Sequence, residues 1–283
     1  MNSVLIVGSS SNLSFAIQSF CRRNGIPFSV IPTYETRSWN SSEIVINQKV
    51  LSSVRAHLDL IQFDRIIWTI GLTNSHSSPS ELDFVNVTFP ITFAKIIGTT
   101  NFTGPTLFPG ALMENFDLLS GDSPYLKSKR RFSEKLSIVD SNWVNLRFSV
   151  WYGKERIKTH LFLGSLISAL RMNSDFQMSN GLQLREYHHI DDDVQALFVD
   201  FGRLSQVHLN VAHGETYTLG QIAERIFSSV GKLNLLRLGA LPSNPNENYN
   251  VYFEPPEIFR NLSFRPTFPS LIEYVLDKSI EGI

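Results

Sequence analysis

The sequence contains a single cysteine, Cys21, among its 283 residues. One thiol cannot form an internal disulfide bond, and it cannot build a cysteine-based zinc site. Positive and negative charges nearly cancel, with 25 Lys and Arg against 26 Asp and Glu, so no excess of positive charge indicates a nucleic-acid partner. No apolar run approaches the roughly 18 residues that a membrane-spanning helix needs.

A secretion signal is not evident either. The only apolar stretch near the N-terminus is Val4–Val7, and no basic segment precedes it. We therefore expect a cytoplasmic protein without a membrane partner. The hydrophobic fraction of 42% and the charged fraction of 18% are those of an ordinary globular chain, which excludes an intrinsically disordered one.

The first 150 residues alternate between apolar, strand-like runs and helical periodicity. We expect strands at residues 4–7, 28–31, 44–46, 65–70, 107–112 and 144–150, and helices at 13–21, 51–61, 82–97 and 124–139. Pro90 is expected to bend the third of these helices. Alternation of this kind predicts a parallel sheet with right-handed crossovers.

The pattern changes after Trp151. Helical runs are expected at residues 161–170, 192–204, 219–230 and 271–277, with one more strand at 207–211. Thr218 and Gln221 have the spacing of a capping box that opens one of these helices. The predicted fold class is therefore α/β: a doubly wound parallel sheet followed by a smaller C-terminal α+β domain.

The turn after the first strand, Gly8-Ser-Ser-Ser-Asn-Leu-Ser14, is the first candidate site. In a doubly wound fold this turn binds the pyrophosphate of a dinucleotide at the N-terminus of the next helix. Three glycines at three-residue spacing are typical, but Ser11 and Ser14 stand at two of these positions. Serine is small, and its hydroxyl can donate to a phosphate. Taken alone, the turn fits an ordinary strand–helix connection better.

Tyr125 and Lys129 form the second candidate site. Ser123 suits a helix cap and Pro124 the first helical position, so residues 125 and 129 lie on one helical face. A nearby ammonium lowers the pKa of a phenol and makes it a usable acid or base. The alternative is a solvated basic face, but the pair opens the helix between the fifth and sixth strands, at the sheet edge where ligands bind.

Two later segments carry polar residues. His188-His-Ile-Asp-Asp-Asp193 contains metal-ligating residue types, but its spacing matches no defined site. Acidic residues at a helix start interact favourably with the helix dipole, so we expect no metal there. Arg185 stands in an otherwise apolar stretch; its guanidinium suits a diphosphate, and a plain surface charge explains it equally well.

Together, these segments resemble the extended short-chain dehydrogenase/reductase family, whose members are epimerases, dehydratases and reductases of nucleotide sugars. The resemblance extends over nearly the whole chain. It is carried, in order, by residues 7–14, 64–71, 85–88 around Asn86, 125–136, 146–153, 184–192, 209–215 and 264–266.

The resemblance implies a Rossmann-type domain over residues 1–152, with a return segment at about 187–212, and a substrate-binding region over 153–186 and 213–283. It implies NAD or NADP as cofactor, Tyr125 as the catalytic acid/base, and Lys129 holding the nicotinamide ribose and lowering the pKa of the tyrosine. Arg185 would bind the substrate diphosphate. The implied cofactor-binding residues are Gly8, Ser11, Asn12, Leu13, Arg37, Thr69, Ile70, Gly71, Asn86, Tyr125 and Lys129. A homodimer through a four-helix contact of residues 82–97 and 124–139 is implied as well.

Two features depart from the family pattern. The family's active-site Ser or Thr ends the fifth strand, where this chain reads Phe108-Pro-Gly-Ala-Leu112. The possible replacements are Ser120, Ser123, Thr99 and Thr100. No acidic residue for the ribose of NAD ends the second strand at 31–34, and Arg37 lies just beyond, which favours NADP over NAD.

The sequence therefore predicts an NAD(P)-dependent oxidoreductase acting on a nucleotide-activated sugar of polysaccharide biosynthesis. The leading hypothesis is reduction of a 4-keto group with Tyr125 as proton donor. A 4,6-dehydratase is not expected, because the Thr-Asp-Glu of that branch is absent. The alternatives are a nucleotide-sugar 4-epimerase with tightly bound NAD, a dehydrogenase of a smaller carbonyl compound, and a non-catalytic dinucleotide-binding pseudoenzyme.

Overall fold

The computed structural model describes residues 3–32, 48, 52–58, 61–73, 77–115, 123–153, 159–202, 204–245, 247 and 249–280. The chain forms two compact units. Unit 1 comprises Met1–Asp117, Asp122–Phe148 and Val194–Val211, and unit 2 comprises Leu118–Gly121, Ser149–Asp193 and Ala212–Ile283. Three sequence expectations, the strand at 44–46, Arg37 and Ser120, lie outside the described residues.

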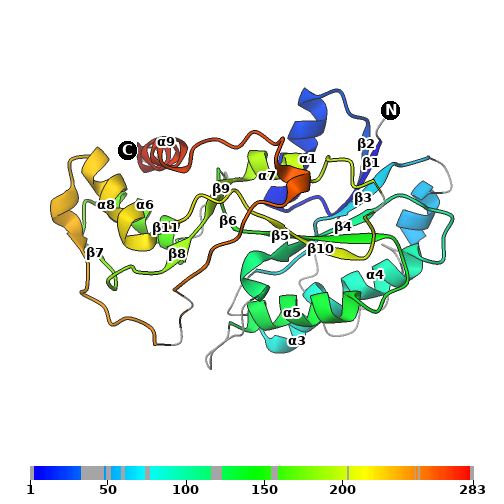
Figure 1. Ribbon diagram of the computed structural model, residues 1–283, viewed down its shortest axis with the longest axis horizontal. Helices are drawn as coiled ribbons and strands as arrows, with labels where there is room; N and C mark the ends of the chain where they lie inside the picture. Colours follow the sequence, from blue (N-terminus) through cyan, green and yellow to red (C-terminus); the bar gives the residue numbers. More distant parts are fainter. Residues whose placement is uncertain are drawn as a thin grey trace. The chain divides into compact units, whose positions relative to one another are not determined.

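A six-stranded parallel sheet forms the centre of unit 1 (Figure 1). In spatial order its strands are β10 (Val207–Val211), β5 (Trp143–Phe148), β4 (Thr106–Ala111), β3 (Arg65–Trp68), β1 (Val4–Val7) and β2 (Phe28–Ile31). The strands β1 and β3 are buried along their whole length, as expected for continuous apolar runs in a parallel sheet. The strand order reverses beside β1, and ligands bind doubly wound sheets at such a point.

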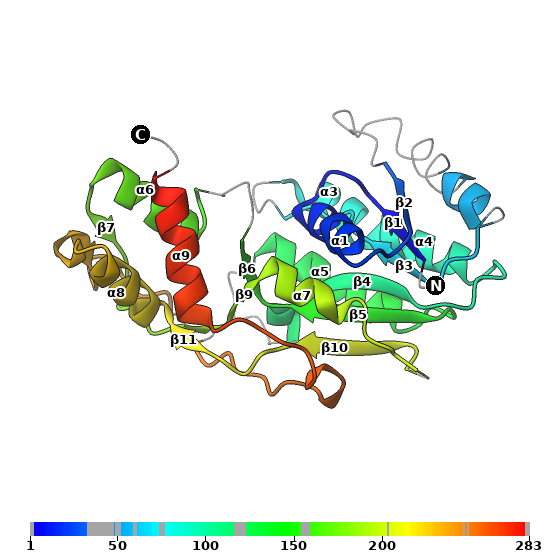
Figure 2. The same cartoon turned by 90° about the horizontal axis from the view of Figure 1, so that it is seen from above.

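Helices cover both faces of this sheet. One face carries α1 (Asn12–Arg23), and the opposite face carries α4 (Phe89–Ile97) and α5 (Pro124–Leu136), as Figures 1 and 2 show. The ring of Phe108 on β4 lies 5.4 Å from that of Phe132 on α5 and 6.3 Å from that of Trp68 on β3, measured between centroids. This aromatic core holds α5 against the end of β4.

The helix expected at residues 82–97 is broken into three parts. It begins as α3 (Pro79–Asp83), continues as a π-helical turn at Phe84–Thr88, and resumes as α4. Pro90 lies in the first turn of α4, where its missing N–H removes a helical hydrogen bond. The irregular turn therefore comes immediately before the proline, whereas a bend within one helix was expected.

Unit 2 consists of three two-stranded sheets and several helices. The paired strands are β6 (Val150–Tyr152) with β9 (Tyr187–His189), β8 (Leu184–Arg185) with β11 (Tyr217–Thr218), and β7 (Phe176–Gln177) with β12 (Leu236–Arg237). The longer helices are α6 (Phe162–Met172), α8 (Leu219–Ser229) and α9 (Thr267–Ile280). Among the helices in the described ranges, none has the length and apolar character to cross a membrane.

The predicted fold class is confirmed, although several bounds differ. The expected strand 144–150 is interrupted at Ser149 and becomes β5 and β6. The expected helix 192–204 is the shorter α7 (Ile190–Ala196). The capping box at Thr218 is confirmed, because its side chain accepts the N–H of Gln221 and the Gln221 side chain accepts the N–H of Thr218.

Candidate active site

The turn between β1 and α1 lies at the carboxyl end of β1. Gly8 has a φ of +109°, and a Cβ at this position would lie 2.6 Å from Thr69 Oγ1, so a side chain does not fit. Ser11 caps α1, since its Oγ accepts the N–H of Ser14 at 3.0 Å. The buried Ser14 hydroxyl instead donates to the carbonyl oxygen of Gly8 at 2.7 Å. The two serines therefore differ: Ser14 closes the turn, and Ser11 retains a hydroxyl hydrogen for a ligand.

The N-terminus of α1 provides donors for an anion. The N–H groups of Asn12 and Leu13 have no hydrogen-bond partner within the described part of the chain. Thr69 does not add to them, because its hydroxyl donates to the carbonyl oxygens of Val7 and Gly8 at 3.0 Å each. Free N–H groups and the helix dipole together favour a phosphate at this place.

Asn86 connects the segment after β3 to α5. Its carboxamide accepts the N–H of Leu72 and donates to the Leu72 carbonyl oxygen, both at 2.8 Å. It also donates to Ser128 Oγ at 2.9 Å, and Ser128 donates to the carbonyl oxygen of Tyr125 at 2.7 Å. Next to this amide lies Gly71, where a Cβ would be 3.7 Å from Asn86 Oδ1. Asn86 therefore fixes the chain around the expected site through protein contacts.

Tyr125 and Lys129 lie one turn apart on α5. Lys129 Nζ is 6.0 Å from the centroid of the Tyr125 ring and donates to the carbonyl oxygen of Pro109 at 2.8 Å. Burial lowers the pKa of Lys129 to about 8, and the negative charge of Glu114 limits this decrease. Burial, followed by the charge of Glu114, raises the pKa of Tyr125.

This direction differs from the expectation that Lys129 lowers the pKa of the tyrosine. The ammonium binds the Pro109 carbonyl oxygen and lies 6.0 Å from the centroid of the phenol ring, so its attraction for a phenolate is weaker than the cost of burying that charge. Tyr125 is therefore a phenol at neutral pH.

Near the end of β4, Gly110 has little space for a side chain. A Cβ at Gly110 would lie 2.8 Å from Asn145 Oδ1 and 2.9 Å from Arg147 Cγ. Thr99 and Thr100 precede β4, at the amino edge of the sheet, and donate to carbonyl oxygens of α4. Ser123, at the start of α5, forms no capping hydrogen bond with its side chain. It is the remaining candidate hydroxyl among the residues that the structure describes.

Sequence reasoning missed Glu114, a buried carboxylate in the short helical turn Leu112–Asn115 after β4. Its Oε1 accepts from Arg147 Nε at 2.6 Å and from the Ser133 hydroxyl, and its Oε2 accepts the N–H of Ala111 at 3.1 Å. No motif marks this residue. The available signal was an acidic residue directly after a strand end that lacks the expected hydroxyl.

Arg185 belongs to unit 2. Its guanidinium forms an ion pair with Glu247, with 2.5 Å between Nη2 and Oε1, and it donates to the carbonyl oxygen of Leu184. Both side chains of the ion pair are largely buried. A diphosphate at Arg185 would therefore compete with a carboxylate of the protein itself.

Unit 2 also contains a buried cluster of histidines around Asp193. The Asp193 carboxylate accepts from His188 Nδ1 at 2.8 Å, from His213 Nε2 at 3.0 Å and from Trp151 Nε1 at 2.6 Å. Burial would lower the pKa of His188, but Asp193 and Glu186 outweigh it and raise that pKa to about 9. Burial would raise the pKa of Asp193, but the two histidines lower it to about 2.

The donor atoms of His188, Asp193 and His213 lie within 4.8 Å of one another, which suggests a metal site. The two imidazole rings, however, are stacked with centroids 3.4 Å apart and an interplanar angle of 9°. A metal in the plane of one ring would lie far outside the plane of the other, whereas histidine binds metals through an in-plane lone pair. The geometry therefore favours a hydrogen-bonded ion pair.

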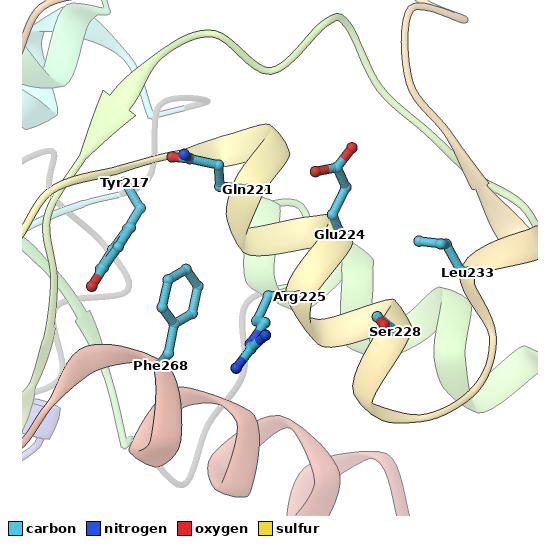
Figure 3. Close-up of a pocket in the computed structure, with 7 residues that line it drawn as sticks. All are labelled: Tyr217, Gln221, Glu224, Arg225, Ser228, Leu233 and Phe268. Atoms are coloured by element: carbon cyan, nitrogen blue, oxygen red, sulfur yellow. The ribbon is translucent and has the colours of Figure 1, made fainter.

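An open groove of about 480 Å³ lies beside α8 in unit 2 (Figure 3). Tyr217 and Phe268 line it with ring centroids 4.1 Å apart. The polar side chains of Gln221, Glu224 and Arg225 on α8 line it as well, and Figure 3 shows Arg225 beside Phe268. None of the site residues expected from the sequence lines this groove.

No protein-family model and no curated protein matches the sequence. Solved structures do match it. A UDP-glucose 4-epimerase from Thermus thermophilus in complex with NAD has 14% identity, a TM-score of 0.75, and coverage of 99% of this chain and 100% of that chain. The Bordetella bronchiseptica enzyme WbmG in complex with NAD has 15% identity, a TM-score of 0.76, and coverage of 99% and 94%.

A third match is DesIV, a dTDP-glucose 4,6-dehydratase from Streptomyces venezuelae, with NAD and TYD bound. It has 15% identity and a TM-score of 0.74, and the alignment covers 99% of this chain and 97% of that chain. At these identities the likeness concerns the fold. The chain has the fold of NAD-dependent nucleotide-sugar epimerases and dehydratases, and the family resemblance of the sequence is confirmed at that level.

Proposed function

We propose that this protein is an NAD(P)-dependent oxidoreductase acting on a nucleotide-activated sugar, and that it reduces a 4-keto group with Tyr125 as proton donor. The fold shared with nucleotide-sugar enzymes supports the substrate class. The observation that carries the role of Tyr125 is its position on α5 one turn before Lys129, whose Nζ lies 6.0 Å from the centroid of its ring.

The residues of the β1–α1 turn fit a dinucleotide. Ser11 and the N–H groups of Asn12 and Leu13 would hold the pyrophosphate, and Gly8 and Gly71 permit a close approach of the backbone. Lys129 would hold the nicotinamide ribose. When bound, the dinucleotide supplies the hydride. We favour NADP because no acidic residue stands at positions 31–34 after β2. The match to NAD complexes supports a nicotinamide dinucleotide in general.

In the proposed reaction, the sugar C4 carbonyl carbon receives the hydride and the carbonyl oxygen takes the proton of the Tyr125 hydroxyl, which gives an alcohol. Water then returns a proton to the phenolate, and Lys129 stabilises the phenolate meanwhile.

Arg185 is the proposed ligand of the substrate diphosphate. Since Glu247 already occupies its guanidinium, substrate binding would replace one anion with another.

We also infer that the protein acts as a homodimer through α4 and α5. The exposed residues of these helices include Lys95, Lys127, Arg131 and Lys135, so we expect a polar contact that weakens at low salt. Light scattering at two salt concentrations checks this.

The test is to incubate the purified protein with a 4-keto nucleotide sugar and either NADPH or NADH. We expect absorbance loss at 340 nm, a product two mass units heavier than the substrate, and faster turnover with NADPH. Lys127→Met is the matched control for Lys129→Met, because Lys127 is exposed on the same helix. Only Lys129→Met should lose activity.

Three results would replace this proposal. Interconversion of 4-epimers by protein that retains NAD through purification would establish the epimerase. Binding of NADPH or NADH without turnover of any nucleotide sugar would favour the non-catalytic, dinucleotide-binding alternative. Absence of NADPH and NADH binding at millimolar concentration, measured by fluorescence titration, would exclude an oxidoreductase.

A further inference from the structure

Glu114 is a charged residue in unit 1 that the reaction above does not use. Its side chain is only 1% exposed. Four groups from three elements bind its carboxylate: Ala111 N–H and the side chains of Ser133, Asn145 and Arg147. A buried carboxylate is costly unless it is paired and hydrogen-bonded. This set of donors therefore pairs and hydrogen-bonds the Glu114 carboxylate beside α5.

Glu114 and Lys129 hold the same short piece of chain. Lys129 Nζ binds the carbonyl oxygen of Pro109 at 2.8 Å, and Glu114 Oε2 binds the N–H of Ala111 at 3.1 Å. Ser133, one turn after Lys129 on α5, binds the other oxygen of Glu114. The carboxyl end of β4 is thus fixed between the ammonium and the carboxylate, and α5 carries both Lys129 and the Ser133 ligand of Glu114.

Few charged groups lie near the Glu114 carboxylate in the described part of the chain. Arg147 pairs with it directly, with Nε at 2.6 Å. Arg130 reaches only the main-chain oxygen of Glu114, at 3.3 Å. His208 binds Asn145 and Ser137 and contacts Glu114 only through Asn145. Glu114 is the charged group whose field acts on both Tyr125 and Lys129, and for both it favours the protonated form.

We propose that Glu114 is a positioning residue for the Tyr125–Lys129 pair: its buried, Arg147-paired carboxylate fixes the end of β4, to which Lys129 is hydrogen-bonded, and places a negative charge near both groups. This inference rests on the proposed function for its catalytic meaning.

The same network crowds position 110 near the end of β4. Gly110 faces Asn145 and Arg147, whose atoms already occupy the space of a side chain there, and both residues bind Glu114. A side chain at position 110 would therefore meet the ligands of this carboxylate.

The test measures the protonation of Lys129 without cofactor or substrate. The ¹³Cε resonances of ¹³C-lysine-labelled protein are followed from pH 6 to pH 11, and Lys129→Arg assigns the signal. We expect a midpoint near the lowered value of about 8 in the wild type. Glu114→Gln should lower it by about one pH unit, because it removes a negative charge. Arg147→Gln should raise it, because it leaves the carboxylate without its counter-charge.

Opposite shifts distinguish an electrostatic role from a structural one, since loosening of the fold would move both variants in the same direction. Glu114→Asp retains the charge and should keep the midpoint near that of the wild type. If Glu114→Gln does not fold, the comparison of Arg147→Gln with Glu114→Asp carries the test, because only the first should raise the midpoint. An unchanged midpoint in Glu114→Gln or Arg147→Gln, or shifts of the same sign, overturns the proposal. Absence of turnover with 4-keto sugars would refute the proposed function and leave this titration intact.

Discussion

The two units each contain a buried cluster of ionisable residues, and the clusters differ in how their charges are balanced. In unit 2, the Asp193 carboxylate accepts three hydrogen bonds. The pKa of His188 is raised to about 9, and that of Asp193 is lowered to about 2. In unit 1, the ammonium of Lys129 has a neutral carbonyl as its hydrogen-bond partner, and its pKa falls to about 8.

This difference separates a cluster that stabilises the fold from one in which a proton can move. An ion pair in which both pKa values lie far from neutral pH keeps its charges at all ordinary pH values. It therefore stabilises the fold and exchanges no protons. A lysine whose pKa moves toward neutrality, beside a tyrosine with no internal hydrogen-bond partner for its hydroxyl in the described structure, is available for proton transfer. The more conspicuous motif in the sequence, His188 to Asp193, thus belongs to the cluster that stabilises the fold.

The largest expected effect is on turnover. Tyr125→Phe should decrease kcat by about 10³-fold, within the 10²–10⁴ range of general acid catalysis. Tyr152→Phe is the matched control, because Tyr152 is a buried tyrosine of unit 2 whose hydroxyl bonds to Ser270. We expect it to retain activity and to lose about 1 kcal/mol of stability. Equal kcat values in the two variants would contradict the assignment of Tyr125.

The next effect is on stability. Asp193→Ala removes the shared acceptor of His188, His213 and Trp151 and leaves a buried imidazolium, so we expect a loss of about 3–5 kcal/mol in urea unfolding. Asp175→Ala breaks an ion pair with Arg237 whose side chains are 45% and 48% exposed. Its loss should stay below about 1 kcal/mol. Similar losses for both variants would show that the cluster of unit 2 is not a stabilising centre.

The pH dependence of stability should also differ between the clusters. The pKa of His188 is raised from 6.5 to about 9 in the folded state, so its stabilisation is complete below pH 6.5 and is lost as pH rises through 9. The pKa of Lys129 is lowered from 10.5 to about 8, so its burial cost is present below pH 8 and disappears as pH rises toward 10.5. The free energy of unfolding is measured from pH 6 to pH 11. His188→Gln should flatten its dependence on pH between pH 6.5 and 9, and Lys129→Met should flatten it between pH 8 and 10.5. Flattening of the higher interval by His188→Gln and of the lower one by Lys129→Met would refute this comparison.

The smallest effects concern the two serines of the β1–α1 turn. Ser11→Gly should cost only a few tenths of a kcal/mol in stability, while the Kd for NADPH should rise about tenfold through loss of a hydrogen bond to a charged group. Ser14→Ala should lose about 1 kcal/mol in stability with little change in Kd. Fluorescence titration and urea unfolding of each variant check this. If only Ser14→Ala weakened NADPH binding, the contact with the ligand would belong to Ser14 and not to Ser11.

Much of the fold could be predicted from the sequence because local patterns determine it. The apolar runs at Val4–Val7 and Arg65–Trp68 are strands buried on both faces, and the capping box at Thr218 opens α8. The division of residues 82–97 into two helices and a π-helical turn could not be predicted, because the proline at position 90 allows several local solutions. Packing of α4 on the sheet selects one of them.

The candidate site was predicted only in part. Tyr125, Lys129 and the turn at Gly8 follow from spacing along the chain, because a helix places residues four apart on one face and a strand end leads into a helix start. The roles of Ser11 and Ser14 could not be separated in this way, since the same hydroxyl faces a ligand in one place and the turn in the other.

The sequence by itself determined the α/β alternation, the helix that carries Tyr125 and Lys129, and the turn that begins α1, because each depends on neighbours within about one or two helical turns. Only the tertiary structure decided the charge states. Glu114 is 15 positions from Lys129 and 33 from Arg147 in sequence, and His213 is 20 from Asp193. Proton affinity depends on burial and on charges that the fold brings together across such separations, and no local pattern in the sequence records them.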